Sequence, residues 1–173
     1  MSLSLNHQQE KQVRQKTASL IQQAALIFQQ PLPVIDIYFD LKGRNLGMYV
    51  RQQRQSYIRY NSFVFARHFD DCLKQTTAHE VAHYVCDKRY GLKNIRPHGK
   101  EWQAVMLALG VPPKVTSNLD ISGLPARRYQ QFTYQCGCQQ HQLSSIRHNK
   151  IQRGRAVYHC RQCGQTLKLN SNG

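Results

Sequence analysis

Three residues near the middle of the chain have the types and the spacing of a catalytic metal site. His79, Glu80 and His83 lie in residues 77–85, a stretch that reads as a helix. Side chains four residues apart lie on one face of a helix, so both imidazoles can reach the same metal ion. Glu80 lies beside His79 and can take a proton from a water held by that ion without being a ligand. This H-E-x-x-H spacing is typical of zinc peptidases and predicts hydrolysis of an amide bond.

Two histidines do not complete a catalytic zinc site, because such a site has three protein ligands and one open position. His98 is fifteen residues after His83 and stands at the start of the next expected helix. Gly91 and Pro97 allow the chain to turn back before it. Glu101 is the alternative ligand, since it lies one helical turn further on the same face. The spacing favours His98 and leaves Glu101 open.

A peptidase site usually also contains a hydrogen-bond donor for the oxyanion that forms at the attacked carbonyl. The sequence offers three tyrosine hydroxyls for this task, those of Tyr60, Tyr84 and Tyr90. Each tyrosine is also an ordinary core or surface residue, and the sequence does not choose among them.

Two pairs of closely spaced cysteines near the end of the chain predict a second metal site. They are Cys136, Cys138, Cys160 and Cys163. The second pair is a C-x-x-C-G knuckle of a zinc ribbon, whereas the first is C-x-C and one residue short. His141 or His148 is therefore an alternative to one of the cysteines. A four-ligand site of this kind is structural, because it stabilises a small β module that has too little core to fold alone.

The net charge predicts a polyanionic partner. Lys and Arg outnumber Asp and Glu by 24 to 9, which gives a formal charge of +15. Asp120 is the last acidic residue, so the C-terminal third is basic throughout. Such an uneven surplus in a small protein usually indicates binding to nucleic acid. Solubility alone is the alternative explanation.

The basic residues between the two cysteine pairs are the candidate nucleic-acid-binding residues. They are Arg147, Lys150, Arg153 and Arg155. Aromatic rings occur around them, at Tyr129, Phe132, Tyr134 and Tyr158, and the patch can extend to Arg51, Arg54 and Arg59. Cationic groups bind phosphates and rings stack on exposed bases. No base-reading motif is present, so we expect DNA binding through the backbone, without sequence specificity.

Apolar periodicity and turn residues predict the elements that position these sites. The expected helices cover residues 6–30, a segment from Asp70 or Asp71 to about Tyr90, and residues 98–109. The expected strands cover residues 34–41, 46–50 and 56–60, and their close succession predicts an antiparallel meander. Residues 114–126 read as a linker, and residues 127–169 as short β segments between the cysteine pairs. Cys72 and Cys86 have no ligand spacing and are expected in the core.

The expected fold class is α+β, with zincin-like helices packed on a small antiparallel sheet and followed by a C-terminal zinc-ribbon-like module. The predicted domains are residues 1–120 and residues 121–173. No apolar leader follows Met1, and no run approaches the ~20 apolar residues that span a bilayer. We therefore expect a cytoplasmic protein without a membrane partner, whose cysteines are thiols or metal ligands.

The motifs together resemble those of the SprT family, the bacterial relatives of the Spartan metalloproteases. The resemblance rests on H-E-V-A-H at residues 79–83, on P-H-G-K-E-W at residues 97–102 and on the closing cysteine pairs. It covers nearly the whole chain. The family's H-G-x-x-[FW] segment supplies the third histidine, which implies His98 as a ligand and places Glu101 outside the first shell of ligands.

The sequence and the resemblance together predict a zinc-dependent endopeptidase with one catalytic and one structural Zn²⁺. Glu80 is the expected general base, and the resemblance implies that the substrates are proteins bound or crosslinked to DNA. One alternative is a nucleic-acid-binding regulatory protein with a non-catalytic zinc site, although binding alone has no use for Glu80. The other is a zinc hydrolase of small amides, which leaves the basic module unexplained.

Overall fold

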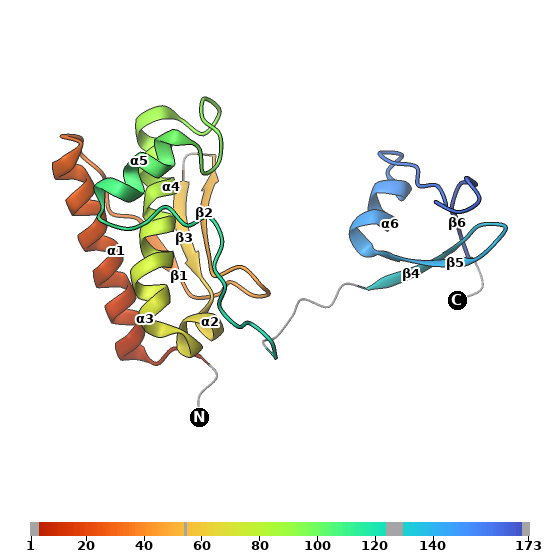
Figure 1. Cartoon of the computed structure of the whole chain (residues 1–173), viewed down its shortest axis with the longest axis horizontal. Coiled ribbons are helices and arrows are strands. Elements are labelled where there is room, and N and C mark those ends of the chain that lie inside the picture. Colours follow the sequence, from red (N-terminus) through yellow and green to blue (C-terminus); the bar gives the residue numbers. More distant parts are fainter. Residues whose placement is uncertain (1–3, 54, 124–129, 171–173) are drawn as a thin grey trace. The chain divides into compact units, whose positions relative to one another are not determined.

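The computed structural model describes residues 4–53, 55–123 and 130–170. The chain divides into two compact units, Met1–Ala126 and Arg127–Gly173 (Figure 1). Within the described ranges, no helix combines the length and apolar character that crossing a membrane requires. Arg54 and Tyr129, two residues of the predicted patch, lie outside the described residues.

The first unit begins with the long helix α1 (His7–Ile27), which confirms the amphipathic helix expected from the sequence. Asn6 caps it: its side-chain oxygen accepts a hydrogen bond from the Gln9 amide at 2.8 Å, and the Gln9 side chain accepts one from the Asn6 amide. The apolar side of α1, which includes Val13, is buried in the main core. Because both ends of the capping box are satisfied, the helix starts at a defined residue.

The sheet of this unit contains β1 (Asp36–Tyr38), β2 (Gly47–Gln52) and β3 (Gln55–Tyr60), in the spatial order β1-β3-β2. β2 and β3 form the expected antiparallel hairpin, but β1 runs parallel to β3, so the predicted antiparallel meander is wrong in its order. The physical reason is the connection after β1, which crosses the end of β3 instead of turning back beside β1.

Asn61 fixes this crossing connection. Its side-chain amide donates hydrogen bonds to the carbonyls of Gly43 and Asn45, each at 3.0 Å. The Leu41 amide also donates to the Tyr60 carbonyl at 3.3 Å. The free edge of β1 is covered as well, because the Arg14 guanidinium of α1 donates to the Ile37 carbonyl at 2.8 Å.

A nearly continuous helical segment then leads to the metal motif. It consists of α2 (Ser62–Arg67), α3 (Phe69–Asp71), the π-helical turn η1 (Cys72–Thr76) and α4 (Thr77–Tyr90). As predicted, the metal-motif helix ends at Gly91. In Figure 1, α4 lies between α1 and the sheet, and α5 (Lys100–Ala108) lies beside its C-terminal part.

The core of the first unit is built around α4. Trp102, Tyr60 and Phe65 are among its largest fully buried side chains. Cys72 and Cys86 are buried too, which confirms the prediction that they are core residues. Burial raises the pKa of both thiols to about 12.

The second unit is a small sheet with one helix: β4 (Gln131–Gln135), β5 (Gln140–Ser144), α6 (Ser145–Gln152) and β6 (Lys168–Leu169). Its strands are antiparallel in the order β5-β4-β6. The prediction of β segments alone missed α6. The expected fold class, α+β followed by a small C-terminal β module, is confirmed. The buried core of this unit is small: Tyr134, Leu143, Cys160 and Leu167.

Candidate metal centre and active-site cleft

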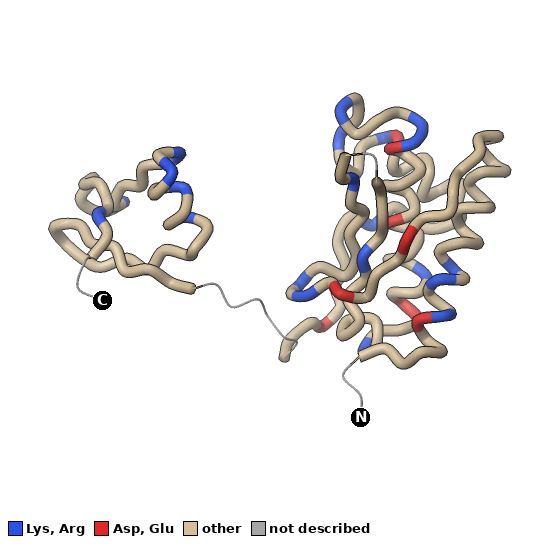
Figure 2. The backbone as a smooth tube through the Cα atoms, turned by 180° about the vertical axis from the view of Figure 1, so that it is seen from behind, with Lys and Arg blue, Asp and Glu red and all other residues tan. Residues whose placement is uncertain are grey.

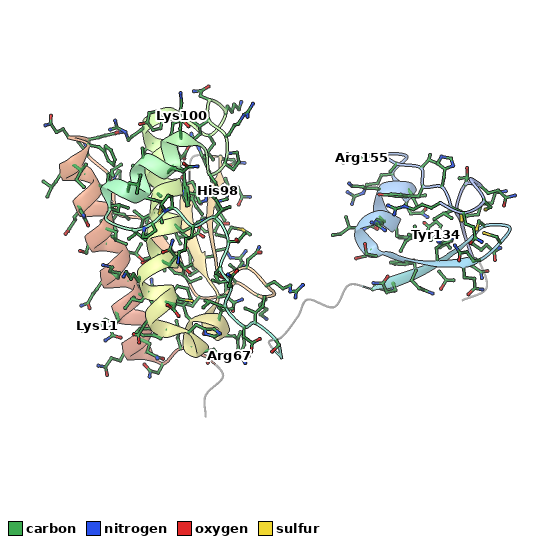
Figure 3. The ribbon with its side chains drawn as sticks, viewed as in Figure 1. Lys11, Arg67, His98, Lys100, Tyr134 and Arg155 are labelled. Carbon is green, nitrogen blue, oxygen red and sulfur yellow. The ribbon has the colours of Figure 1, made fainter. Side chains whose placement is uncertain are left out.

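The three predicted histidine ligands converge at one point. His79 and His83 lie one turn apart on α4, and His98 lies just before α5 (Figure 3). The distances between their Nε2 atoms are 3.2 Å for His79 and His83, 3.1 Å for His83 and His98, and 3.0 Å for His98 and His79. Nitrogen ligands about 2.0–2.1 Å from a tetrahedral zinc ion lie about 3.3 Å from one another, so the three rings fit zinc.

His98 reaches this point through an unusual backbone conformation. Its φ angle is 57°, in the left-handed region that non-glycine residues seldom adopt. The Trp102 ring packs against the histidine cluster, with its centroid 4.7 Å from that of His79 and 4.8 Å from that of His98. Among the described residues, Glu101 does not belong to the converging group, so the alternative ligand is not brought to the site.

Burial keeps the imidazoles in the form that binds metal. It lowers the pKa of His79 to about 4 and that of His83 to about 3, and the neighbouring histidines act in the same direction. A hydrogen bond between the His79 ring and the backbone of Lys114 opposes the shift of His79. Burial also lowers the pKa of His98. All three rings are therefore neutral at pH 7 and can each donate a lone pair.

Glu80 lies in the same place but is held differently. Its side chain is buried, with 5% of the residue exposed, and its Oε2 atom accepts a hydrogen bond from the Tyr49 amide of β2 at 2.7 Å. Burial raises its pKa to about 8, although the Tyr49 hydrogen bond acts in the opposite direction. A divalent cation held by the histidines would favour the ionised carboxylate. The group is thus poised to gain or lose a proton near neutral pH.

A buried carboxylate connects β2 to α4 beside this site. The Tyr49 hydroxyl donates to Asp87 Oδ2 at 2.6 Å, and Arg51 donates to the other carboxylate oxygen of Asp87. Asp87 is buried on α4, one turn beyond His83. These contacts hold β2 against α4 and so keep the Tyr49 amide on Glu80.

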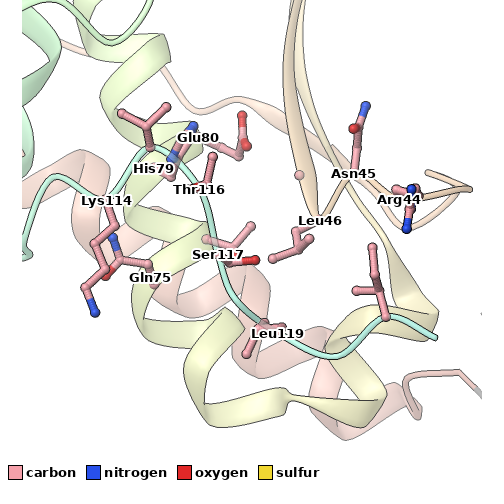
Figure 4. Close-up of a pocket in the computed structure, with 14 residues that line it drawn as sticks. Arg44, Asn45, Leu46, Gln75, His79, Glu80, Lys114, Thr116, Ser117 and Leu119 are labelled. Carbon is pink, nitrogen blue, oxygen red and sulfur yellow. The ribbon is translucent and has the colours of Figure 1, made fainter.

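Two cavities open beside the histidine cluster, and both are lined by Gly47, His79 and Glu80. The first has a volume of about 320 Å³ and is shown in Figure 4. The second has a volume of about 410 Å³ and reaches His83 and His98. The histidine cluster therefore borders two cavities with shared walls, which together we call the cleft.

The three tyrosines considered for oxyanion stabilisation do not line either cavity. Tyr60 is fully buried and its hydroxyl lies 3.0 Å from that of Thr17. The Tyr84 hydroxyl donates to the Pro33 carbonyl at 2.8 Å. Tyr90 is at the far end of α4. All three are structural or surface residues in this arrangement.

The four cysteines of the second unit also converge. Their Sγ atoms all lie within 4.8 Å of one another, and two of the pairs measure 3.4 Å and 3.6 Å. Sulfur ligands about 2.3 Å from a tetrahedral zinc ion lie about 3.8 Å apart, so this set fits zinc as well. Backbone hydrogen bonds from Cys163 and Gln162 lower the pKa of Cys160, whereas hydrogen bonds with the neighbouring thiols raise the pKa of Cys138. The four sulfur atoms thus share a proton network that zinc binding would replace.

The two histidines considered as substitutes for a cysteine have other positions. The ring of His148 stacks on Phe132 with centroids 3.7 Å apart, and its Nδ1 atom lies 3.1 Å from the Tyr134 hydroxyl. His141 lies at the rim, with its Nε2 atom 3.4 Å from Cys136 Sγ. His148 therefore packs α6 onto β4, and His141 contacts a cysteine rather than replacing it.

The four basic residues of the predicted nucleic-acid site lie on or just after α6. Arg147 and Lys150 are in the helix, Arg153 and Arg155 follow it, and all four are exposed. Figure 2 shows this unit with Lys and Arg but no Asp or Glu, as the sequence after Asp120 requires. The Arg147 guanidinium lies over the Tyr158 ring at 5.8 Å.

The suggested extension of the basic patch in the first unit is not a set of unpaired cations. Arg51 is paired with Asp87, and Arg59 with Asp40 at 2.8 Å. The Arg59 hydrogen bond lowers the pKa of Asp40. Both arginines lie on strands of the first sheet, and their charges are used in ion pairs within the first unit.

Sequence reasoning missed Gly47 and Tyr49, the two β2 residues that hold Glu80. A weak signal was present, because a glycine inside a strand often marks a close approach of another group. The contribution of Tyr49 comes from its backbone amide, which leaves no signal in the residue type.

Sequence comparisons agree with the two-unit arrangement. A sequence model of the SprT-like family matches residues 17–130, and one of the SprT-like zinc ribbon domain matches residues 130–170. The chain is 35% identical to Protein SprT of Vibrio parahaemolyticus over 170 residues, covering 98% of this chain and 96% of the relative. It is 32% identical to Protein SprT of Pasteurella multocida, covering 92% and 93% of the two chains. No solved structure matches it significantly.

Proposed function

The chain belongs to the SprT-like family, and from this premise we propose that it is a zinc-dependent endopeptidase acting on proteins bound or crosslinked to DNA. One observation carries the proposal: three imidazole Nε2 atoms converge beside the buried carboxylate of Glu80, in the cleft that the two cavities form. A closed structural zinc site would have four protein ligands and no use for such a carboxylate.

His79, His83 and His98 are the proposed zinc ligands of this site. Zinc bound there supplies Lewis-acid chemistry, which polarises the scissile carbonyl and makes water more acidic. Glu80 accepts the proton of the attacking water on its carboxylate and then delivers it to the leaving amine. The Tyr49 amide holds that carboxylate in place, Gly47 leaves room for it, and the Trp102 ring packs on the imidazoles.

The second unit is proposed to bind DNA and a structural zinc ion. Cys136, Cys138, Cys160 and Cys163 are the proposed ligands, since their sulfur atoms converge. The exposed cations of α6 and the turn after it would bind phosphates without reading bases. The reduced, metal-binding chemistry of the cysteines agrees with a cytoplasmic location, which we also propose.

The test compares the wild-type protein with Glu80→Gln, both loaded with zinc, on a DNA-binding protein substrate. Digestion is followed with and without single- and double-stranded DNA. We expect Glu80→Gln to cleave roughly 100- to 10,000-fold more slowly while it keeps its zinc. Cleavage by Glu80→Gln at the wild-type rate would show that Glu80 is not the general base.

A second variant separates DNA binding from catalysis. We expect DNA to increase cleavage of the protein substrate by wild type. Replacing Arg147, Lys150, Arg153 and Arg155 by alanine should abolish this increase and leave the cleavage of a short peptide unchanged. If instead neither wild type nor any variant cleaves, and DNA binding remains salt-sensitive, the protein is the alternative, a nucleic-acid-binding regulator with a non-catalytic zinc site. The basic second unit is the observation that favours this alternative.

A further inference from the structure

The two cavities beside Glu80 differ in chemistry, and this difference points to a substrate preference. Building on the proposed peptidase function, we propose that the cleft selects peptide segments with an acidic side chain on one side of the scissile bond and an apolar side chain on the other. The acidic side chain lies in the cavity of Figure 4 and the apolar one in its neighbour.

The cavity of Figure 4 is cationic. Arg44 and Lys114 line it from opposite walls, and both are exposed. Among the described residues neither has an ion-pair partner, and Glu80 is the only carboxylate that lines the cavity. The hydroxyls of Thr116 and Ser117 add hydrogen-bond donors. An acidic side chain entering here gains two attractive charges, whereas a lysine or arginine is repelled by both.

The neighbouring cavity is mainly apolar. Its walls include Met48, Leu92, Ile95, Pro97 and Trp102. One exposed cation, Arg96, also lines it, against two in the cavity of Figure 4. Leu92 and Ile95 come from the loop between α4 and α5, and Leu92 is one of the exposed large apolar residues of the chain. With a volume of about 410 Å³, this cavity can accept a large aliphatic or aromatic side chain and remove its apolar surface from water.

The wall that carries Lys114 is held at both ends. We call residues 114–121 the strap, which Figure 4 shows crossing the cavity opposite Arg44 and Leu46. Just before the strap, the Gln75 side chain donates to the Pro112 carbonyl at 2.8 Å. At its end, Arg67 pairs with Asp120 at 2.8 Å. The two contacts attach the ends of the strap to α2 and η1, on the wall that faces Arg44.

A peptide fits this combination better than a nucleic acid does. Phosphates would also be attracted by Arg44 and Lys114, but they repeat along a strand, and the other half of the cleft is mainly apolar, with Arg96 as the cation among its lining residues. An extended peptide carries different side chains on successive residues, so it can satisfy both halves at once. The two cavities meet at Gly47, His79 and Glu80, where the peptide bond would lie.

The experiment measures binding separately from cleavage. The zinc-loaded full-length Glu80→Gln variant is titrated into short fluorescein-labelled peptides that share one leucine and carry either aspartates, serines or lysines on the other side of the central bond. Fluorescence anisotropy gives the affinities. We expect the aspartate peptide to bind most tightly, the serine peptide less tightly and the lysine peptide most weakly. The preference for aspartate should weaken as salt is added.

Charge reversal identifies the residues responsible. Arg44→Glu combined with Lys114→Glu should weaken binding of the aspartate peptide about tenfold, equivalent to about 1.4 kcal/mol, and strengthen binding of the lysine peptide. Lys11→Glu on α1 reverses one charge far from the cleft, half the charge change of the double variant, and is the control for either single reversal. It should leave the order of affinities unchanged.

The outcomes separate this proposal from the proposed function. Equal affinities for the three peptides, or an order that the double reversal does not alter, would overturn the acidic preference even if the wild type cleaves all of them. The acidic preference would also be overturned if a single-stranded oligonucleotide displaced the peptide and bound the double variant more weakly than the parent protein. The cleft would then be a nucleic-acid site. The expected order without any cleavage by wild type would support the preference and overturn the peptidase.

Discussion

Gly47 on β2 lies directly against the carboxylate of Glu80 on α4. A Cβ atom at residue 47 would lie 2.7 Å from both Cγ and Oε1 of Glu80, closer than non-bonded atoms approach. The carboxylate is buried and held by the Tyr49 amide, so it has little room to move away. The strand thus determines where the proposed general base lies.

We therefore predict that Gly47→Ala loses more activity than its loss of stability explains. Displacing the proposed general base should lower the cleavage rate roughly 100-fold and leave the zinc content unchanged, while the buried clash lowers the free energy of unfolding by about 1–3 kcal/mol. Peptide cleavage, zinc analysis and chemical denaturation measure the three quantities.

Gly43→Ala is the control for this variant. Residue 43 has open space around it but a φ of 86°, which alanine disfavours by about 1–2 kcal/mol. It should lose stability and keep activity. If Gly47→Ala loses activity only in proportion to its stability, the contact with Glu80 does not matter for catalysis.

The backbone of His98 gives a second prediction, about stability without metal. Its φ of 57° suits glycine, whereas His83 lies within α4. In the presence of a chelator, His98→Gly should be more stable than His83→Gly by about 1–2 kcal/mol. Both variants should lose the zinc of this site.

Chemical denaturation of the two chelated variants checks the stability difference, and zinc titration checks the affinity. Equal destabilisation would mean that the His98 conformation carries no strain of its own. If His98→Gly kept the zinc of this site, His98 would not be one of its ligands.

The pKa of Glu80 predicts a pH dependence of the metal-free protein. In the folded chain this pKa is raised to about 8, so the folded state holds a proton that the unfolded state has already lost above pH 4.5. Stability from this group is present at low pH and is lost as pH rises through 8. The loss between pH 6.5 and pH 8 should be about 1.5 kcal/mol.

Glu80→Gln should lack this loss, so the two unfolding free energies should differ in slope over that pH window. His79, His83 and His98 act in the opposite direction in the lower part of this window, because their folded pKa values are lowered and only the unfolded rings still bind protons near pH 6.5. Both proteins share this contribution, so it cancels in the difference between their slopes. Identical slopes for wild type and Glu80→Gln would mean that Glu80 is ionised in the folded, metal-free chain.

The small core of the second unit predicts that it depends on its metal. Cys160→Ser should reduce the zinc content from two ions to one and unfold this unit, because Cys160 is both a proposed ligand and one of four buried core residues. The first unit should keep its zinc and cleave a short peptide.

His148→Gln is the matched variant for the ligand assignment. His148 packs on Phe132, away from the four sulfur atoms, so this variant should keep two zinc ions and lose only packing energy. Loss of one zinc ion in His148→Gln would mean that His148 is a zinc ligand. Limited proteolysis separates metal loss from unfolding.

The parts of the site that follow from local spacing were predictable from the sequence. His79 and His83 share a helix face because they are four residues apart, and apolar periodicity showed that the helix exists. The left-handed turn at His98 brings the third ring to the same point, and only the resemblance, not the spacing, made it the clear choice over Glu101. The two cysteine pairs were equally readable, although their C-x-C spacing left His148 open.

Other features depended on contacts that the sequence does not encode locally. The order β1-β3-β2 depends on where the connection after β1 crosses, which Asn61 fixes from a distance. Tyr49 donates a hydrogen bond to Glu80 from its backbone amide, which any residue except proline could provide. Helix α6 has no fully buried residue, so its apolar periodicity is too weak to be read as a helix.

The hydrogen bonds at the two edges of the first sheet have a consequence for association between copies of the chain. Edge strands expose rows of free donors and acceptors on which another chain can add a strand. Here one backbone group at each edge is used within the chain: Arg14 of α1 donates to the Ile37 carbonyl of β1, and Glu80 of α4 accepts from the Tyr49 amide of β2. The carboxylate proposed to act on substrates therefore also occupies a donor of an edge strand, so we expect changes at residue 80 to alter association between chains as well as chemistry.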